Sequence, residues 1–133
     1  MSARKWLSSI LGTLLVVAGV WTSLVAQSAA APGLIQGNIK AADGAPMEGV
    51  IVSARASSRS FTTSVFTDQQ GRYMFPSLDA GQYRVWAQAV GFEAGRSDVA
   101  LAGAPVDRHF TLAAIGDTSR IVKQMSGVEY LQN

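Results

Sequence analysis

The sequence predicts an all-β protein: a single seven-stranded antiparallel β-sandwich with a hydrophobic N-terminal segment and a short helical tail. Three observations lead to this prediction. Apolar and polar residues alternate in short runs, as in strands that place one face on a core. Turn-forming residues separate these runs every several residues, which is typical of a sandwich. The stretch 67–87, TDQQGRYMFPSLDAGQYRVWA, combines both features.

The first 31 residues have the features of a targeting segment. Arg4 and Lys5 provide a basic start, and no charged residue occurs from Trp6 to Gln36. The small residues QSAAA at 27–31 fit a signal-peptidase site, which predicts cleavage before Ala31.

An uncleaved membrane anchor at residues 6–26 is the alternative. This segment has 21 residues, and about 20 are needed to cross a bilayer. Trp6 and Trp21 then lie near the two interfaces, with the basic end in the cytoplasm. Both alternatives remain open, and both place the rest of the chain outside the cytoplasm, in the periplasm or another extracytoplasmic space.

The sandwich begins with three predicted strands. The first covers 34–40, and the second covers 50–56 with its even-numbered residues inward and Ser53 and Arg55 outward. The third covers 61–67 and is rich in Thr, Val and Phe, which strands favour.

The stretch 67–87 provides strands four and five, near 72–75 and 82–90, with a turn from Asp68 to Gly71 before them. Strands 97–101 and 106–112 form the last pair, so the sandwich occupies residues 33–114. The residues that the central stretch is expected to bring to the core are Tyr73, Phe75, Leu78, Tyr83 and Val85, opposite Val50 and Val52.

The tail, residues 117–133, carries helix signals. Asp117-Thr118-Ser119 can cap a helix, and apolar residues follow at helical spacing. A second cap signal, S-x-x-E, stands at 126–129. Because so short a helix is marginal alone in water, we expect it to pack on the sandwich or on a partner. The residues expected to contact a partner are Ile121, Met125, Tyr130 and Leu131.

The spacing T-D-x-x-G-x-Y-x-F-x-x-L-x-x-G-x-Y-x-V-x-A over 67–87 resembles the carboxypeptidase regulatory-like family. Upstream, Gly37-x-Ile39, DGAP at 43–46 and GVIV at 49–52 fit as well, so the resemblance covers Gly33 to about Leu112. The family is related to Cna protein B-type and transthyretin-like sandwiches and is grouped with carbohydrate-binding-like folds. The resemblance implies this fold and an accessory role without naming a ligand.

The tail loosely resembles the connector that follows such a domain in some bacterial periplasmic proteins, where a cytochrome c-like part comes next. A short relative of a longer protein is therefore an alternative to a partner-docking tail.

Composition bears on several classes of function. The chain has no cysteine, which excludes disulfides and iron–sulfur clusters within it. The net charge of +2 comes from Arg4 and Lys5, because the other basic and acidic residues balance at nine each. The arginines are scattered among acids along the sequence, which indicates a solvated surface and no nucleic-acid partner.

No pattern in the sequence indicates a catalytic, cofactor or metal site. His109 is the only histidine and is expected on the last strand as a half-exposed sheet residue. A metal site or a Ser-His relay would need further partners. No aspartate begins a calcium-binding loop, and no H-x-x-E motif occurs. We therefore predict that the chain is not an enzyme.

Trp86 is the candidate contact residue within the sandwich. It alternates out of phase with Tyr83 and Val85, so it is expected on the outer face or in a second core layer. On the outer face it suits stacking on a sugar ring or a protein. Phe61, Phe66 and Phe92 are further candidates for such a platform.

The predicted function is a non-catalytic, exported interaction or structural module that binds a protein partner in the bacterial cell envelope. The alternative is a carbohydrate-binding module of the periplasm or cell surface. An apolar patch that includes the tail would favour a protein partner, and an exposed row of aromatic residues would favour a sugar.

Overall fold

The computed structural model describes residues 31–126. Its elements are β1 (Ile35–Ala41), β2 (Ile51–Ala56), β3 (Thr63–Phe66), β4 (Arg72–Met74), β5 (Gly81–Gln88), β6 (Gly95–Leu101), β7 (Val106–Asp107), β8 (Phe110–Leu112) and α1 (Thr118–Met125). The predicted signal or anchor segment with Trp6 and Trp21, and the contact residues Tyr130 and Leu131, lie outside the described residues. Within 31–126, no helix has the length and apolar character needed to span a membrane.

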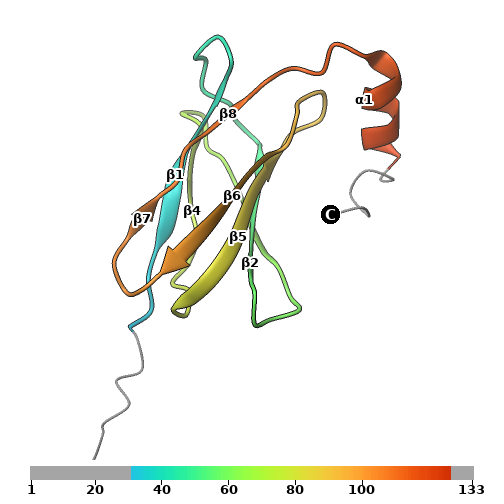
Figure 1. The fold of residues 1–133 in the computed structure, drawn as a ribbon. Coiled ribbons are helices and arrows are strands. Elements are labelled where there is room, and N and C mark those ends of the chain that lie inside the picture. Colours follow the sequence, from blue (N-terminus) through green and yellow to red (C-terminus); the bar gives the residue numbers. More distant parts are fainter. Residues whose placement is uncertain (1–30, 127–133) are drawn as a thin grey trace, which may run out of the picture.

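The strands form two four-stranded sheets that pack as a sandwich (Figure 1). One sheet has the order β4-β1-β7, with β8 also paired to β1, and the other has the order β3-β2-β5-β6. The helix α1 stands beside the turn between β5 and β6. The predicted β-sandwich with a helical tail is confirmed.

The topology differs from the prediction in two details. The predicted strand 106–112 is divided into β7 and β8, which gives eight strands, and both pair with β1 in parallel. The predicted pairing of 97–101 with 106–112 does not occur, because β6 pairs with β5 in the opposite sheet. Sequence neighbours often pair, but here the chain crosses between sheets after Leu101. The third strand is also shorter than predicted, 63–66 instead of 61–67.

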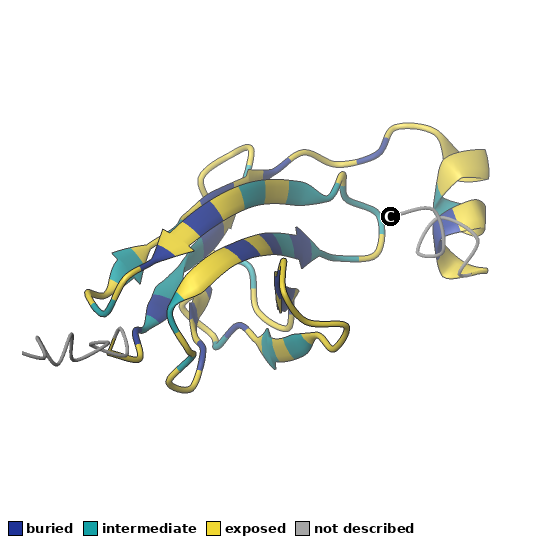
Figure 2. Cartoon of the chain, turned by 60° about the horizontal axis from the view of Figure 1, so that its bottom comes forward, coloured by how far each residue is buried: buried dark blue, intermediate teal, exposed yellow. Residues whose placement is uncertain are grey.

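Buried and exposed residues alternate along the strands, as Figure 2 shows. Tyr73, Phe75, Tyr83 and Val85 are buried, and Leu78 packs half-buried against them. Val50 and Val52 face this cluster, as predicted.

Ser53 is buried although it lies on the outer side of β2, where it was expected to be exposed. Its hydroxyl hydrogen-bonds to that of Ser64 at 2.8 Å, and its other cross-strand partner is Trp86. The bulk of the neighbouring indole explains how a small outward side chain is shielded from water.

Asp68 organises the predicted turn before β4. Its Oδ1 accepts the backbone N–H groups of Gln70 at 2.9 Å and Arg72 at 2.8 Å, and its Oδ2 accepts Nε of Arg72 at 3.0 Å. The backbone hydrogen bond from Arg72 is the main cause that lowers the pKa of Asp68. Gly71 ends the turn with φ of +74°, a conformation that glycine adopts readily. The turn leads directly into β4, which pairs with β1 in the antiparallel direction.

Candidate functional site

The tail helix is capped at both ends. Of the three residues expected to cap it, Asp117 is the N-cap, and its Oδ1 accepts the backbone N–H of Ser119 at 2.9 Å and the Ser119 hydroxyl at 2.8 Å. These hydrogen bonds from Ser119 lower the pKa of Asp117. At the other end, the Ser126 hydroxyl donates to the carbonyl of Lys123 at 2.7 Å. These capping hydrogen bonds stabilise the helix and offset part of the instability that its short length causes.

Gln124 fastens α1 to the turn between β5 and β6. Its side chain is buried, with 5% relative exposure for the residue. The Oε1 atom accepts the N–H of Gly91 at 2.9 Å, and Nε2 donates to the carbonyls of Ala89 at 3.2 Å and Phe92 at 3.1 Å. The sequence does not distinguish this residue, because a glutamine on a short helix has the pattern of a surface residue.

Further contacts hold the segment that leads into α1. The backbone N–H of Ile115 donates to the carbonyl of Gly91 at 2.8 Å, and Ile115 is itself buried. On the helix, Arg120 pairs with Glu93 through both guanidinium nitrogens, at 2.7 and 3.0 Å. The helix therefore has a defined position on the sandwich (Figure 1).

Two apolar side chains of α1 remain exposed. Val122 is 61% and Met125 is 69% exposed, and their spacing of three places them on one side of the helix. We call these two residues the helix patch. Ile121 is half-buried, so of the predicted contact residues that the structure describes on α1, only Met125 lies fully on the surface.

The change Gln124→Ala should release the helix. It removes three hydrogen bonds and leaves the N–H of Gly91 without its partner, so we expect the domain to lose about 1–3 kcal/mol of stability. Hydrogen exchange should show faster exchange over 118–126 and unchanged protection in β2 and β5. Lys123→Ala, at an exposed neighbouring position, is the control and should change stability by less than about 0.5 kcal/mol. Unchanged exchange in the helix would show that other contacts hold it.

Trp86 lies on the outer side of the β3-β2-β5-β6 sheet, the first of its two expected placements. It is half-buried, and its Nε1 donates to Oε1 of Gln88 at 3.2 Å. Phe66 on the edge strand is 67% exposed and faces Ile51 across the β2–β3 pair. The register places Phe66, Ile51 and Trp86 on the same side of three adjacent strands. We call these three residues the aromatic stripe.

The other two predicted platform residues are not part of this stripe. Phe61 lies before β3, and its ring is 5.3 Å from the guanidinium carbon of Arg59. Phe92 is half-buried and packs against the core from the β5–β6 turn.

Three arginines gather on the same side of the sheet as the aromatic stripe. Arg55 is the direct cross-strand partner of Arg84, and Arg96 is that of Trp86. All three are exposed, and Asp98 is the only acid among the strand residues that the structure describes on this side. These three arginines are scattered along the sequence but lie close together in the fold, because strand register brings together residues that are far apart in the sequence.

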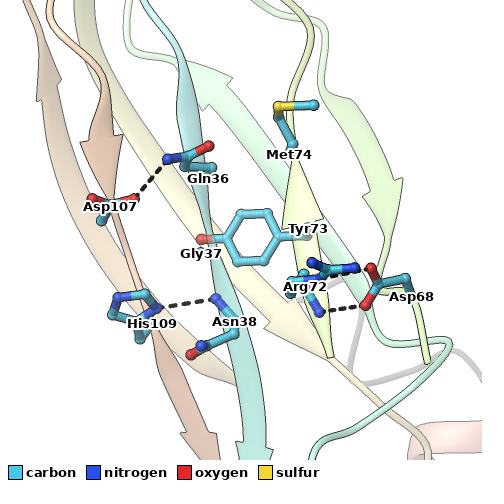
Figure 3. A pocket seen from close by; sticks show the side chains of 9 residues that line it. All are labelled: Gln36, Gly37, Asn38, Asp68, Arg72, Tyr73, Met74, Asp107 and His109. Atoms are coloured by element: carbon cyan, nitrogen blue, oxygen red, sulfur yellow. Dashed lines mark hydrogen bonds and ion pairs between the residues drawn. The ribbon is translucent and has the colours of Figure 1, made fainter. Parts of the chain in front are cut away.

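A polar hollow of about 490 Å³ lies along β1, β4 and β7 in the other sheet (Figure 3). Its polar groups bond mainly to one another. Nε2 of Gln36 donates to Asp107 at 3.0 Å, and the backbone N–H of Asn38 donates to Nδ1 of His109 at 3.1 Å. The lining residues are Gln36, Gly37, Asn38, Asp68, Arg72, Tyr73, Met74, Asp107 and His109.

The hollow lies beside the two residues that separate β7 from β8, Arg108 and His109. Here the carbonyl of Arg108 turns toward Gly37, and the Tyr73 hydroxyl donates to it at 2.5 Å. Figure 3 shows the Tyr73 ring reaching from β4 across Gly37. His109, expected as a half-exposed strand residue, is exposed and lies between the two strands. The Tyr73 hydroxyl and the His109 imidazole thus act as hydrogen-bond partners for backbone groups where the parallel pairing with β1 is interrupted.

The side chains of the hollow form hydrogen bonds and the ion pair between Arg72 and Asp68. Its lining contains no serine, threonine or cysteine. Burial raises the pKa of Tyr73 to about 12, which keeps its hydroxyl protonated and a poor nucleophile. Among residues 31–126, no three histidine, cysteine or acidic side chains are grouped as metal ligands.

The pKa of Tyr73 predicts a loss of stability at alkaline pH. The folded protein keeps this proton up to about pH 12, whereas the unfolded chain releases it near 10.0. Between these values the folded state binds more protons, so stability falls as pH rises. Tyr73→Phe should flatten this decline in urea unfolding between about pH 10 and pH 12, and Tyr83, whose pKa burial also raises, should keep part of it. An equally steep decline in the variant would contradict the assignment to Tyr73.

Comparison with solved structures finds domains of the same fold at low sequence identity. The TIE protein of Bacillus anthracis aligns with a TM-score of 0.54 and 13% identity, over 64% of this chain and 17% of that chain. A 3-chlorocatechol 1,2-dioxygenase of Rhodococcus opacus aligns with a TM-score of 0.50 and 12% identity, over 63% and 60%. The 5-hydroxyisourate hydrolase of Klebsiella pneumoniae aligns with a TM-score of 0.51 and 24% identity, over 63% and 92%.

These similarities establish a shared fold and no activity. The chain spans less than two thirds of the dioxygenase and of the TIE protein. No curated protein matches the chain in sequence. The sequence profile of the carboxypeptidase regulatory-like domain matches residues 34–113, which is more than half of the chain. The chain therefore belongs to the carboxypeptidase regulatory-like domain family.

Proposed function

We propose that the chain is a non-catalytic interaction module of the bacterial cell envelope that binds a protein partner through helix α1. The helix patch carries the proposal. Val122 and Met125 are exposed on a helix that Gln124 fixes from its other side. An exposed apolar pair on a firmly docked helix suits insertion into a groove of another protein.

The docking of the helix lowers the free-energy cost of binding. A free tail would lose conformational entropy when it ordered on a partner, whereas α1 is capped and bonded to the sandwich already. Methionine adds an adaptable apolar side chain, which is common at binding surfaces. Val90, exposed on the turn that Gln124 contacts, extends the apolar character of this end of the domain.

The location in the envelope rests on the N-terminal sequence. Arg4 and Lys5 followed by an uncharged, largely apolar run are typical of an exported or anchored protein. The proposal of a non-catalytic role is supported by the family, whose domain is a non-catalytic module.

Co-purification from the native host tests the proposal. The tagged full-length chain, crosslinked in intact cells, should recover one envelope protein, and the double variant Val122→Ser/Met125→Ser should lose it. Phe66→Ser is the matched control, because it removes a similarly exposed apolar side chain from a different surface. Recovery of the same protein by the helix variant, or its loss in the control alone, would contradict the proposal.

A further inference from the structure

We propose that the outer side of the β3-β2-β5-β6 sheet binds an acidic polysaccharide. The site consists of the aromatic stripe together with Arg55, Arg84 and Arg96, and we call it the sheet site. It goes beyond the protein partner proposed above, because it lies on other elements and recognises a different class of molecule.

The aromatic stripe offers an apolar surface that is long enough for more than one sugar ring. Neighbouring strands lie about 4.8 Å apart, so Phe66 and Trp86, whose strands are separated by β2, are at least roughly 10 Å apart. Ile51 is the partner of Phe66 on β2 and extends the apolar surface at that end, whereas the partner of Trp86 on β2 is Ser53. A pyranose ring presents C–H groups on its faces, and these pack on aromatic surfaces. The hydrogen bond from Trp86 to Gln88 fixes the indole before binding, which reduces the entropy lost.

The charges next to the stripe favour an anionic ligand. Three exposed arginines face a single aspartate on the described strands of this side. Arg55 and Arg84 stand directly opposite each other, an arrangement that destabilises a sheet when both residues carry the same charge. A bound carboxylate would relieve this repulsion.

Asp98 leaves Arg84 available for a ligand. The two side chains are 3.5 Å apart and are 62% and 77% exposed, so their ion pair contributes little. The planar guanidinium of arginine can bind a carboxylate through two parallel hydrogen bonds. A chain of uronic acids carries one carboxylate on each ring, which combines the two features that the sheet site provides.

Other polyanions match the site less well. An acidic peptide supplies carboxylates but lacks the repeated rings that would cover the stripe. Single-stranded nucleic acid supplies both rings and charges, but the N-terminal segment predicts that the domain is exported from the cytoplasm. These ligands serve as competing probes in the test.

Affinity electrophoresis of the full-length chain in a mild detergent tests the sheet site. Polygalacturonate in the gel should retard the protein, whereas neutral dextran, polyglutamate and single-stranded DNA should not. Phe66→Ser and the double variant Arg55→Gln/Arg84→Gln should each weaken the retardation by about tenfold or more, and added salt should weaken it further. Thermal melting of each variant shows whether it remains folded.

Two matched controls isolate the site. Arg72→Gln removes an arginine of similar exposure, also paired with an aspartate, from the opposite sheet and should bind normally. Val122→Ser/Met125→Ser should bind normally as well, so failure of this proposal is separate from failure of the protein-partner proposal.

Several results would overturn the sheet site. Absence of retardation by polygalacturonate, or equal retardation by dextran, would refute an acidic polysaccharide as the ligand. Equal retardation by polyglutamate or DNA would show that charge alone, or another polymer, is recognised. An equal loss in Arg72→Gln would place the binding outside this sheet.

Discussion

Replacing Gly37 with alanine should unfold the domain or destabilise it by at least about 3 kcal/mol. A Cβ atom at this position would lie 1.8 Å from the carbonyl oxygen and 2.6 Å from the carbonyl carbon of Arg108. Because both atoms belong to the backbone, β1 must separate from the segment between β7 and β8. The partly buried hydrogen bond from the Tyr73 hydroxyl to that carbonyl would be lost with it.

Chemical denaturation of the wild type and the variant measures this effect. Gly116→Ala is the matched control, since a Cβ at Gly116 meets no atom within 4 Å and its backbone is not in the left-handed region. It should change stability by less than about 0.5 kcal/mol. Similar midpoints for both variants would show that the parallel pairing of β1 tolerates a side chain at Gly37.

Phe75→Ala should cost about 3–5 kcal/mol of stability, as expected for truncation of a buried aromatic side chain. Phe75 is 1% exposed and lies between the two sheets. Its ring packs edge-to-face on Tyr73, with the centroids 5.9 Å apart, so the loss includes an aromatic contact as well as buried area.

The same substitution at an exposed position provides the control for Phe75. Phe66→Ala removes an identical group from the outer side of β3 and should change stability by less than about 1 kcal/mol. Urea unfolding of both variants at neutral pH makes the comparison. Equal losses would show that the inward and outward sides of the sandwich have been assigned incorrectly.

The sequence was sufficient to predict the sandwich because its alternation is strict where strands pack on a core. Tyr73, Phe75, Tyr83 and Val85 are buried as expected. The parallel pairing of β1 with β7 and β8 was not predictable in this way. Whether two strands pair in parallel or antiparallel depends on the direction in which a distant segment of the chain runs beside the first strand. The alternation of apolar and polar residues is the same in both cases.

The candidate surfaces were predictable only in part. The sequence places Trp86 on the outer face and Asp117 at the start of a helix, since both follow from local spacing. The cluster of Arg55, Arg84 and Arg96 depends on register between three strands. Gln124 is buried because α1 packs against the β5–β6 turn. This contact joins segments that are far apart in the sequence, so no local pattern predicts it.

Site-specific photocrosslinking in intact cells tests most directly whether the outer side of α1 is the binding surface for an envelope protein. A photoreactive amino acid at Met125 should give one discrete adduct with another protein, and the same group at the exposed Lys40, on β1, should give none. The adduct from position 125 should weaken in the background of Gln124→Ala, which releases the helix. No adduct from position 125, or the same adduct from both positions, would contradict a partner-binding role for the helix.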